Sequence, residues 1–242
     1  MGKKAGLIKA VNGFIDMIKD EELREKTRDA FFTPKKDLWG MTFEGFDVSE
    51  SPASRRRHHA YPQGLLEHTV STTRIALLLC DLIEEVYGGR GKVDRDVVLS
   101  GVILHDYMKV PTYERGEDGR VSHSRLAERI DHITLAAVDM TKRDFPLEVI
   151  HAVAAHFGRH GSISPKSIEA LVVYLADHAD SHLNGEVLRA AKALTQRCAD
   201  VELERLDIKT ALNIVSLYAK TGCEALVEYL RGAGLLEERG ET

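Results

Sequence analysis

The segment 97–104 is almost entirely apolar, and a histidine and a carboxylate, His105 and Asp106, follow it directly. Such a segment is expected to be buried, and an imidazole and a carboxylate at its end cost free energy unless partners satisfy both groups. A divalent metal would satisfy them, because imidazole nitrogen and carboxylate oxygen are both good metal ligands. Two adjacent residues cannot complete a coordination sphere, so the fold must bring further ligands to this point.

The spacing of apolar residues indicates helices along most of the chain. It predicts one N-terminal helix that is broken near Asp20, followed by helices over 65–87, 94–108, 126–143, 146–157, 165–183, 186–198 and 208–236. Strand-like alternation is weak, apart from a short piece near 41–46. We therefore expect an all-α fold, a helical bundle.

Composition limits the class of protein. The 242 residues are 43% hydrophobic, which is ordinary for a chain with a buried core, and the net charge of −5 gives no general attraction to nucleic acid. No apolar stretch is long and charge-free enough to cross a bilayer, so we expect no membrane partner. The three cysteines, Cys80, Cys198 and Cys223, lie far apart and predict no disulfide, which favours a cytoplasmic protein.

Several other polar residues interrupt apolar helices and are candidate ligands. They are His68, upstream of His105 and Asp106, and His132, His156 and Asp177, downstream. Taken singly, a histidine in an apolar helix is more often a hydrogen-bonded core residue, and Asp177 reads equally well as a cap or a surface carboxylate. Taken together, costly groups on several predicted helices favour a shared partner, since helical bundles often build metal sites from facing helices.

Three local sequences point to a known family. Residues 58–69 read HHAYPQGLLEHT, residues 104–109 read LHDYMK, and residues 176–180 read ADHAD. This ordered set resembles the HD superfamily of metal-dependent phosphohydrolases, and the local sequences are similar to the HD domain of the YhaM-type 3'-5' exoribonucleases. The resemblance runs from about residue 52 to residue 184.

The resemblance implies a helical bundle of the HD-domain type with extra N- and C-terminal helices. An N-terminal helix and loop would occupy 1–51, the HD domain 52–185, and a C-terminal helical extension packed on the same domain 186–242. It also implies a metal held by His68, His105, Asp106 and Asp177. Asp106 would bridge to a second metal, for which His132 and His156 are the candidate ligands.

The resemblance further assigns catalytic roles to Asp106 and Lys109 and substrate contacts to Lys109, Arg57 and His59. Each assignment has a plainer alternative. Lys109 could complement a helix dipole in solvent, residues 55–57 could form a solvated charged face, and residues 58–59 could be exposed loop histidines. Asp180 reads equally well as a carboxylate that orients a ligand or as an exposed one.

Two features depart from the family pattern. Tyr107-Met108 stands where relatives usually carry Ile-Gly or Leu-Gly, and His156 is followed by Phe157 where many dinuclear members have a second histidine. Both departures lie beside candidate ligands. They are where we expect the specificity of this chain, or a loss of activity, to arise.

The function implied is hydrolysis of a phosphomonoester or phosphodiester of a nucleotide or short nucleic acid by metal-bound hydroxide. One or two divalent transition metals are expected, namely Mn, Fe, Co, Ni or Zn, with Mg as a further candidate. The expected partner is a phosphorylated small molecule. A nucleotide is favoured over the end of an RNA or DNA chain. The amphipathic terminal helices are also compatible with a homo-oligomer. The alternatives are a metal- and nucleotide-binding regulatory module with little or no turnover, and a plain structural helical protein.

Overall fold

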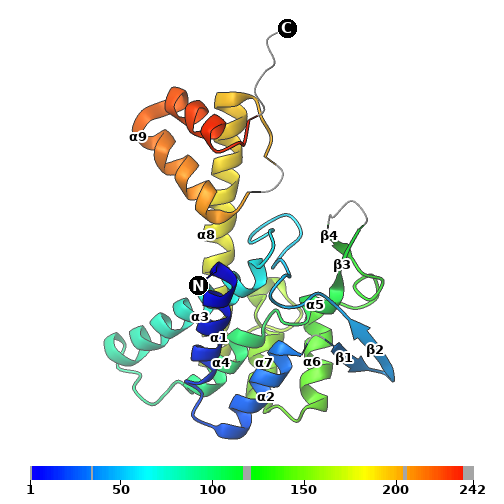
Figure 1. Ribbon diagram of the computed structural model, residues 1–242. Coiled ribbons are helices and arrows are strands. Elements are labelled where there is room, and N and C mark those ends of the chain that lie inside the picture. The colour runs from blue at the N-terminus through cyan, green and yellow to red at the C-terminus, as the bar shows by residue number, and fades with distance from the viewer. Residues whose placement is uncertain (1, 34, 117–120, 204–205, 237–242) are drawn as a thin grey trace.

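The computed structural model describes residues 2–33, 35–116, 121–203 and 206–236, and it confirms the all-α class (Figure 1). The helices are α1 (Lys3–Ile15), α2 (Glu21–Phe32), α3 (Gly64–Asp81), α4 (Arg95–Leu104), α5 (Lys109–Thr112), α6 (His132–Lys142), α7 (Leu147–Ala154), α8 (Ile168–Ala199) and α9 (Ile208–Gly232). A short π-helical turn, η1 (Leu82–Val86), continues α3, and a 3-10 turn, η2 (Gly158–His160), follows α7.

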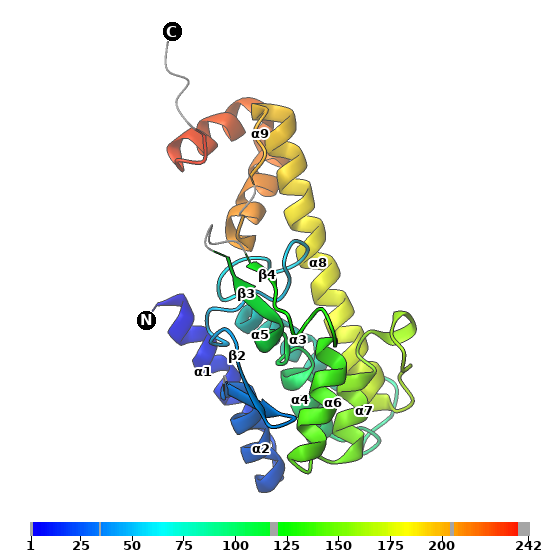
Figure 2. The ribbon, with the colours of Figure 1, turned by 90° about the vertical axis from the view of Figure 1, so that its right-hand side faces the viewer.

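Two small antiparallel hairpins accompany the helices. Strand β1 (Lys35–Leu38) pairs with β2 (Met41–Glu44), and β3 (Tyr113–Arg115) pairs with β4 (Val121–His123). The first hairpin contains the strand-like piece that the sequence indicates near 41–46. Both hairpins lie on one side of the helices (Figure 2).

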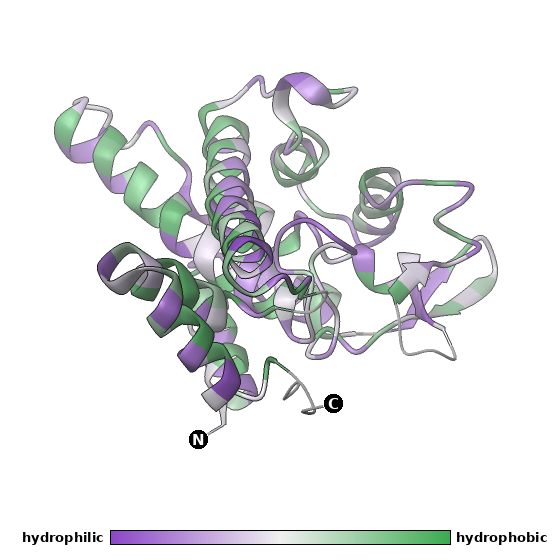
Figure 3. Cartoon of the chain, turned by 90° about the horizontal axis from the view of Figure 1, so that it is seen from above, coloured by the Kyte–Doolittle hydropathy of each residue, from purple (hydrophilic) through white to green (hydrophobic). Residues whose placement is uncertain are grey.

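The helices around α4 enclose the main core. Helix α4 packs against α3, α7 and α8, the N-terminal helices α1 and α2 pack against α3 and α4, and α6 packs against α7. Every residue of 97–104 is buried, as its apolar sequence requires. Seen from above, most helices carry both hydrophobic and hydrophilic residues, the pattern of helices with one buried face (Figure 3).

Helix α8 is longer than the sequence predicts. Instead of two helices over 165–183 and 186–198, one helix runs unbroken through Gly185, and its outer half leaves the main bundle to pack against α9 (Figure 1). A glycine costs only about 1 kcal/mol inside a helix, and burial of Leu188 and Ala191 against α9 offsets that cost. The domain boundary expected after residue 185 therefore falls inside a helix, with no linker between the HD region and the extension.

Two other helix ends differ from the sequence-based limits. Helix α4 starts at the Asp94 cap, whose side chain accepts hydrogen bonds from the backbone N–H groups of Asp96 and Val97, but it ends at Leu104 rather than near residue 108. Helix α6 begins at His132, capped by Asp131, rather than near residue 126. In both places a ligand candidate stands at a helix end.

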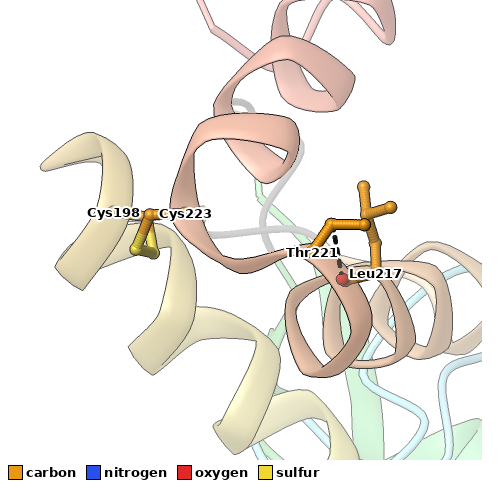
Figure 4. Close-up of a disulfide and its surroundings, with 4 residues drawn as sticks. All are labelled: Cys198, Leu217, Thr221 and Cys223. Carbon is orange, nitrogen blue, oxygen red and sulfur yellow. Dashed lines mark hydrogen bonds between the residues drawn. A yellow bond between two sulfur atoms is a disulfide. The ribbon is translucent and has the colours of Figure 1, made fainter.

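The cysteine prediction is wrong, because Cys198 and Cys223 form a disulfide (Figure 4). Their Cα atoms lie 5.2 Å apart, within the range that a disulfide spans. Cys198 lies near the end of α8, and Cys223 follows a kink at Gly222, whose φ of 78° suits glycine. The two residues meet because α9 folds back along α8, a long-range contact that cysteine spacing does not reveal. In the described part of the chain, no helix is both long and apolar enough to span a membrane.

Candidate metal centre and active site

Three helices bring four of the predicted ligands together. His68 lies in the second turn of α3, His105 and Asp106 follow α4, and Asp177 lies in α8. The Nε2 atom of His68 is 3.0 Å from Nε2 of His105, 3.2 Å from Oδ1 of Asp177 and 3.5 Å from Oδ2 of Asp106. These distances suit donor atoms arranged around one cation.

The hydrogen bonds on the far side of the rings set the tautomers. The Nδ1 atom of His68 lies 2.6 Å from Oδ2 of Asp180, and Nδ1 of His105 lies 2.7 Å from the carbonyl oxygen of Val102. Because both partners only accept, each neutral ring carries its proton on Nδ1 and presents an Nε2 lone pair to the site. At 3.0 Å the two Nε2 atoms cannot both present bare lone pairs to each other, so a proton or a metal ion must lie between them.

A second set of donors lies on the other side of Asp106. Its Oδ1 atom is 3.3 Å from Nε2 of His132 and 3.8 Å from Nε2 of His156. The Nδ1 atom of His156 faces the carbonyl oxygen of Val153 at 2.6 Å, so this ring also presents an Nε2 lone pair. Among the described residues, Asp106 Oδ1, His132 Nε2 and His156 Nε2 are buried atoms without a hydrogen-bond partner. Buried polar atoms are normally satisfied, so these three atoms fit a second ligand set.

The charges of the site favour bound cations. Burial by itself would raise the pKa of Asp106, but the Lys109 ammonium and the surrounding histidines hold it well below its usual range. Burial opposes a charge on His68, yet Asp106, Asp177 and Asp180 together raise its pKa well above the ordinary value. These carboxylates thus favour a positive charge at His68, which is a proton on the ring when no metal is bound and which a bound metal ion would replace. Burial lowers the pKa values of His105, His132 and His156, which keeps these rings neutral and able to ligate a metal.

Asp180 completes the site from behind. Its Oδ2 atom lies 2.6 Å from His68 Nδ1 and 2.8 Å from His59 Nε2, and the residue is buried. The exposed alternative for Asp180 is therefore wrong, and the orienting role is the one that the contacts support. The sequence signal was the spacing of three from Asp177, which puts both carboxylates on neighbouring faces of α8.

His59 is not an exposed loop histidine, nor does it line the cleft. Only 2% of the residue is exposed, and its ring lies 3.0 Å from the Tyr61 hydroxyl at Nδ1 and 2.8 Å from Asp180 at Nε2. The backbone N–H of His59 donates to Oδ1 of Asn184, which ties the 54–62 loop to α8. The resemblance implied that His59 contacts the substrate. Instead, His59 lies behind His68, where both rings contact Asp180.

Lys109 is buried and paired rather than solvated. Its Nζ atom donates to Oδ2 of Asp106 at 2.5 Å, and only 8% of the residue is exposed. Burial would lower the pKa of Lys109, but Asp106 raises it above the ordinary value, so the ammonium stays charged. Lys109 also lines the cleft, so a fixed positive charge stands between the cleft and the donor cluster.

The cleft itself is large, about 1570 Å³. Asp177, His156 and Lys109 line it, and the exposed arginines 55–57 add positive charge to its lining. Residues of α8 also line the cleft. Arg57 thus lies where the resemblance expects a substrate contact.

The Tyr107-Met108 pair does not shape this cleft. Both side chains are buried in the core, and the Tyr107 hydroxyl donates to Oδ2 of Asp139 at 2.8 Å. The expectation that these residues set specificity is therefore wrong, because the turn after Leu104 points them away from the ligands. Phe157, by contrast, is 41% exposed in the cleft and lies against His156, with ring centroids 4.6 Å apart.

Comparison with known proteins agrees with this geometry. The model of the HD domain family matches residues 65–181. A dihydroneopterin 2',3'-cyclic phosphate phosphodiesterase of Methanocaldococcus jannaschii is 41% identical over 230 residues, which cover 92% of this chain and 90% of that protein. The 3'-5' exoribonuclease YhaM of Bacillus subtilis is 26% identical over 194 residues, covering 75% of this chain and 55% of the exoribonuclease. YhaM of Listeria monocytogenes is 31% identical over 149 residues, which cover 57% of this chain and 45% of that enzyme. No solved structure matches the chain significantly.

Proposed function

Since the chain belongs to the HD family of metal-dependent phosphohydrolases, we propose that it is a phosphodiesterase that opens a cyclic phosphate on a diol attached to a planar heterocycle. The similarity to the cyclic phosphate phosphodiesterase supports this substrate class, because it extends over nine-tenths of both chains. The similarity to the YhaM enzymes covers only about half of their length. The partner proposed is thus a phosphorylated small molecule.

The observation that carries the proposal is the position of Asp106 between two donor sets. One carboxylate oxygen faces His68 and the other faces His132. In this proposal His68, His105, Asp177 and Asp106 would hold one divalent ion, and Asp106, His132 and His156 would hold another. When bound, such ions supply Lewis acidity toward the phosphoryl group and its attacking water, and a pair of them suits in-line displacement at a diester.

The ligand types limit which metal ions suit the two sites. Imidazole nitrogen suits Mn, Fe, Co, Ni and Zn, whereas Mg prefers oxygen ligands and near-ideal octahedral geometry. With His68 and His105 in one set and His132 and His156 in the other, we propose a transition metal in both positions.

The remaining roles belong to the cleft residues. Lys109 holds a positive charge beside Asp106 and can pair with a non-bridging phosphoryl oxygen as negative charge develops. Arg57 and its two neighbours offer planar guanidinium groups at the cleft wall, which suit bidentate contact with the phosphate. Phosphate binding by these residues explains how a chain of net negative charge accepts an anion.

Turnover of 2',3'-cyclic nucleotides with added Mn²⁺, Fe²⁺, Co²⁺, Ni²⁺ or Zn²⁺ tests the proposal. Loss of an orienting partner alone typically costs 10- to 100-fold, so removal of the bridging carboxylate in Asp106→Asn should lower kcat/KM by more than about 100-fold. Asp200→Asn is the matched control, since Asp200 is an exposed residue at the end of α8, in a left-handed conformation that asparagine also adopts. Absence of metal-dependent turnover of any phosphorylated compound would contradict the proposal.

A second candidate activity is 3'-5' exonucleolytic cleavage of RNA, which the YhaM similarity and the long cationic cleft favour. Parallel assays on a short 5'-labelled RNA and on the cyclic nucleotide separate the two activities. Faster turnover of the RNA, as kcat/KM, would favour the exonuclease. Tight binding of either compound without product over hours would favour the regulatory module instead.

A further inference from the structure

Helix α8 presents a row of rings to the cleft beside the metal centre. Tyr174, His178 and His182 are spaced by four residues, so they share one face of the helix, and all three line the cleft. The ring centroids of Tyr174 and His178 are 5.8 Å apart, and those of His178 and His182 are 5.9 Å apart with planes only 11° from parallel. The row begins on the turn that carries Asp177.

The two histidines of this row have no evident structural task. Both are exposed, and with the described residues neither imidazole forms a hydrogen bond or an ion pair. They are therefore available to a molecule in the cleft. Two exposed rings next to the proposed centre offer aromatic surface of the kind on which planar heterocycles stack.

The first ring of the row is held in place from the side. Gly158 packs so closely on Tyr174 that a Cβ atom there would lie 2.3 Å from the ring, and its φ of +58° also favours glycine. The preceding residue, Phe157, adds another exposed ring to the cleft. The start of the row is thus ordered before a ligand arrives, which reduces the entropy cost of binding.

The rest of the cleft recognises a different part of the same ligand. Lys109 and the arginines at 55–57 provide charge for a phosphate, whereas the α8 row provides the surface of three rings. From residue 174 to residue 182 a helix rises about 12 Å, so a ring on this row lies within the reach of a nucleoside-sized substrate whose phosphate is at Asp177.

We infer that the row Tyr174, His178 and His182 is the binding site for the planar heterocycle of the substrate, and that it selects ring-bearing phosphoesters over ring-free ones. This inference rests on the proposed phosphodiesterase function and adds where the base binds. Because stacking tolerates different rings, a purine and a pterin should both be accepted.

The double variant H178A/H182A tests the inference against H178F/H182F, which keeps two rings. Substrates are adenosine 2',3'-cyclic phosphate, neopterin 2',3'-cyclic phosphate and the ring-free glycerol 1,2-cyclic phosphate. The alanine variant should raise KM for both ring-bearing esters about tenfold, with kcat and the ring-free ester unchanged, and the phenylalanine variant should retain the wild-type KM. Leu183→Ala is the control, since Leu183 is 65% exposed on α8 but does not line the cleft.

A binding measurement separates this inference from the activity. Quenching of pterin fluorescence on titration of neopterin 3'-phosphate reports the ring directly, and H178A/H182A should weaken this binding about tenfold. Unchanged affinity in the alanine variant, or equal loss for the ring-free ester, would overturn the inference. If wild type hydrolyses no ester but binds the pterin through these rings, the proposed function fails and the stacking site stands.

Discussion

Individual residues of the centre depend on contacts behind them. His68, His105 and His156 each use Nδ1 on an acceptor at the back of the site, namely Asp180, Val102 O and Val153 O. These bonds leave the Nε2 lone pairs to converge on the site. Residue types and order along the chain pointed to these candidate ligands, but they could not show which ring nitrogen is free, because that depends on the acceptor that packing places behind each ring.

Replacing Asp180 tests this dependence. In Asp180→Asn, His68 loses a charged acceptor and His59 loses its pairing partner, so the basicity and orientation of the His68 ring both suffer. We expect metal affinity to fall by about 10- to 100-fold, with the fold unchanged by circular dichroism. Competition titration with a chelating dye measures the affinity, and Asp200→Asn serves again as control. An affinity equal to that of wild type would show that Asp180 has no part in orienting His68.

At the scale of elements, Lys36 joins β1 to α2 and to the turn that follows α4. Lys36 of β1 is 1% exposed, donates to the carbonyl oxygen of Ala30 at 2.7 Å and lies 4.9 Å from the centre of the Tyr107 ring. Burial lowers the pKa of Lys36 from 10.5 to about 8. The sequence indicated only the second strand of this hairpin, because β1 reads Lys-Lys-Asp-Leu, and three charged residues in a row resemble a surface loop.

This lysine gives stability a defined pH dependence. Between pH 8 and 10.5 the unfolded chain binds the Lys36 proton more tightly than the folded protein does, so raising the pH favours the folded state. The free energy of unfolding of wild type should therefore rise relative to that of Lys36→Met, by on the order of 3 kcal/mol over this window. Below pH 8 the difference should be constant. Urea unfolding at several pH values measures it.

The exposed Lys9→Met provides the comparison for that experiment. It removes one lysine from the surface and should leave the pH dependence of unfolding as in wild type. A difference between wild type and Lys36→Met that stays flat from pH 8 to 10.5 would mean that Lys36 titrates at its ordinary value.

The end of α4 is one place where the structure differs from the sequence-based prediction. Consecutive side chains on a helix point about 100° apart, so a helix continuing to residue 108 would direct His105 and Asp106 to different sides. Ending α4 at Leu104 allows both to reach one site and places Tyr107 in the core. Apolar periodicity does not register such an end, because the residues after it are also buried.

At the scale of the whole molecule, α8 joins two cores. Its inner half carries Asp177 and Asp180 in the main bundle, and its outer half forms a second hydrophobic cluster with α9 (Figure 1). The disulfide links the two helices of that second cluster. The sequence argument for a reducing compartment assumed that the cysteines are unpaired, so the disulfide removes its basis.

Removing the disulfide should loosen the extension. A disulfide between residues 25 apart stabilises a fold by about 3 kcal/mol in the chain-entropy account. The free energy of unfolding of C198A/C223A, measured in urea, should therefore be lower than that of wild type by this amount. A reductant should have the same effect on wild type and none on the variant. Thiol titration of the unfolded protein should give one thiol, Cys80, without reductant and three with it. Three thiols without reductant would contradict the disulfide.

The sequence by itself determined the helical class and the identity of the candidate ligands. Both are local properties: apolar spacing sets the buried face of a helix, and a costly polar residue within that face signals a partner. The tertiary structure alone decided that Asp106 faces two donor sets, that Asp180 and His59 stand behind His68, and that Cys198 meets Cys223. Each of these is a contact between residues far apart in the chain, and packing of whole helices, not residue spacing, determines which distant groups come within bonding distance.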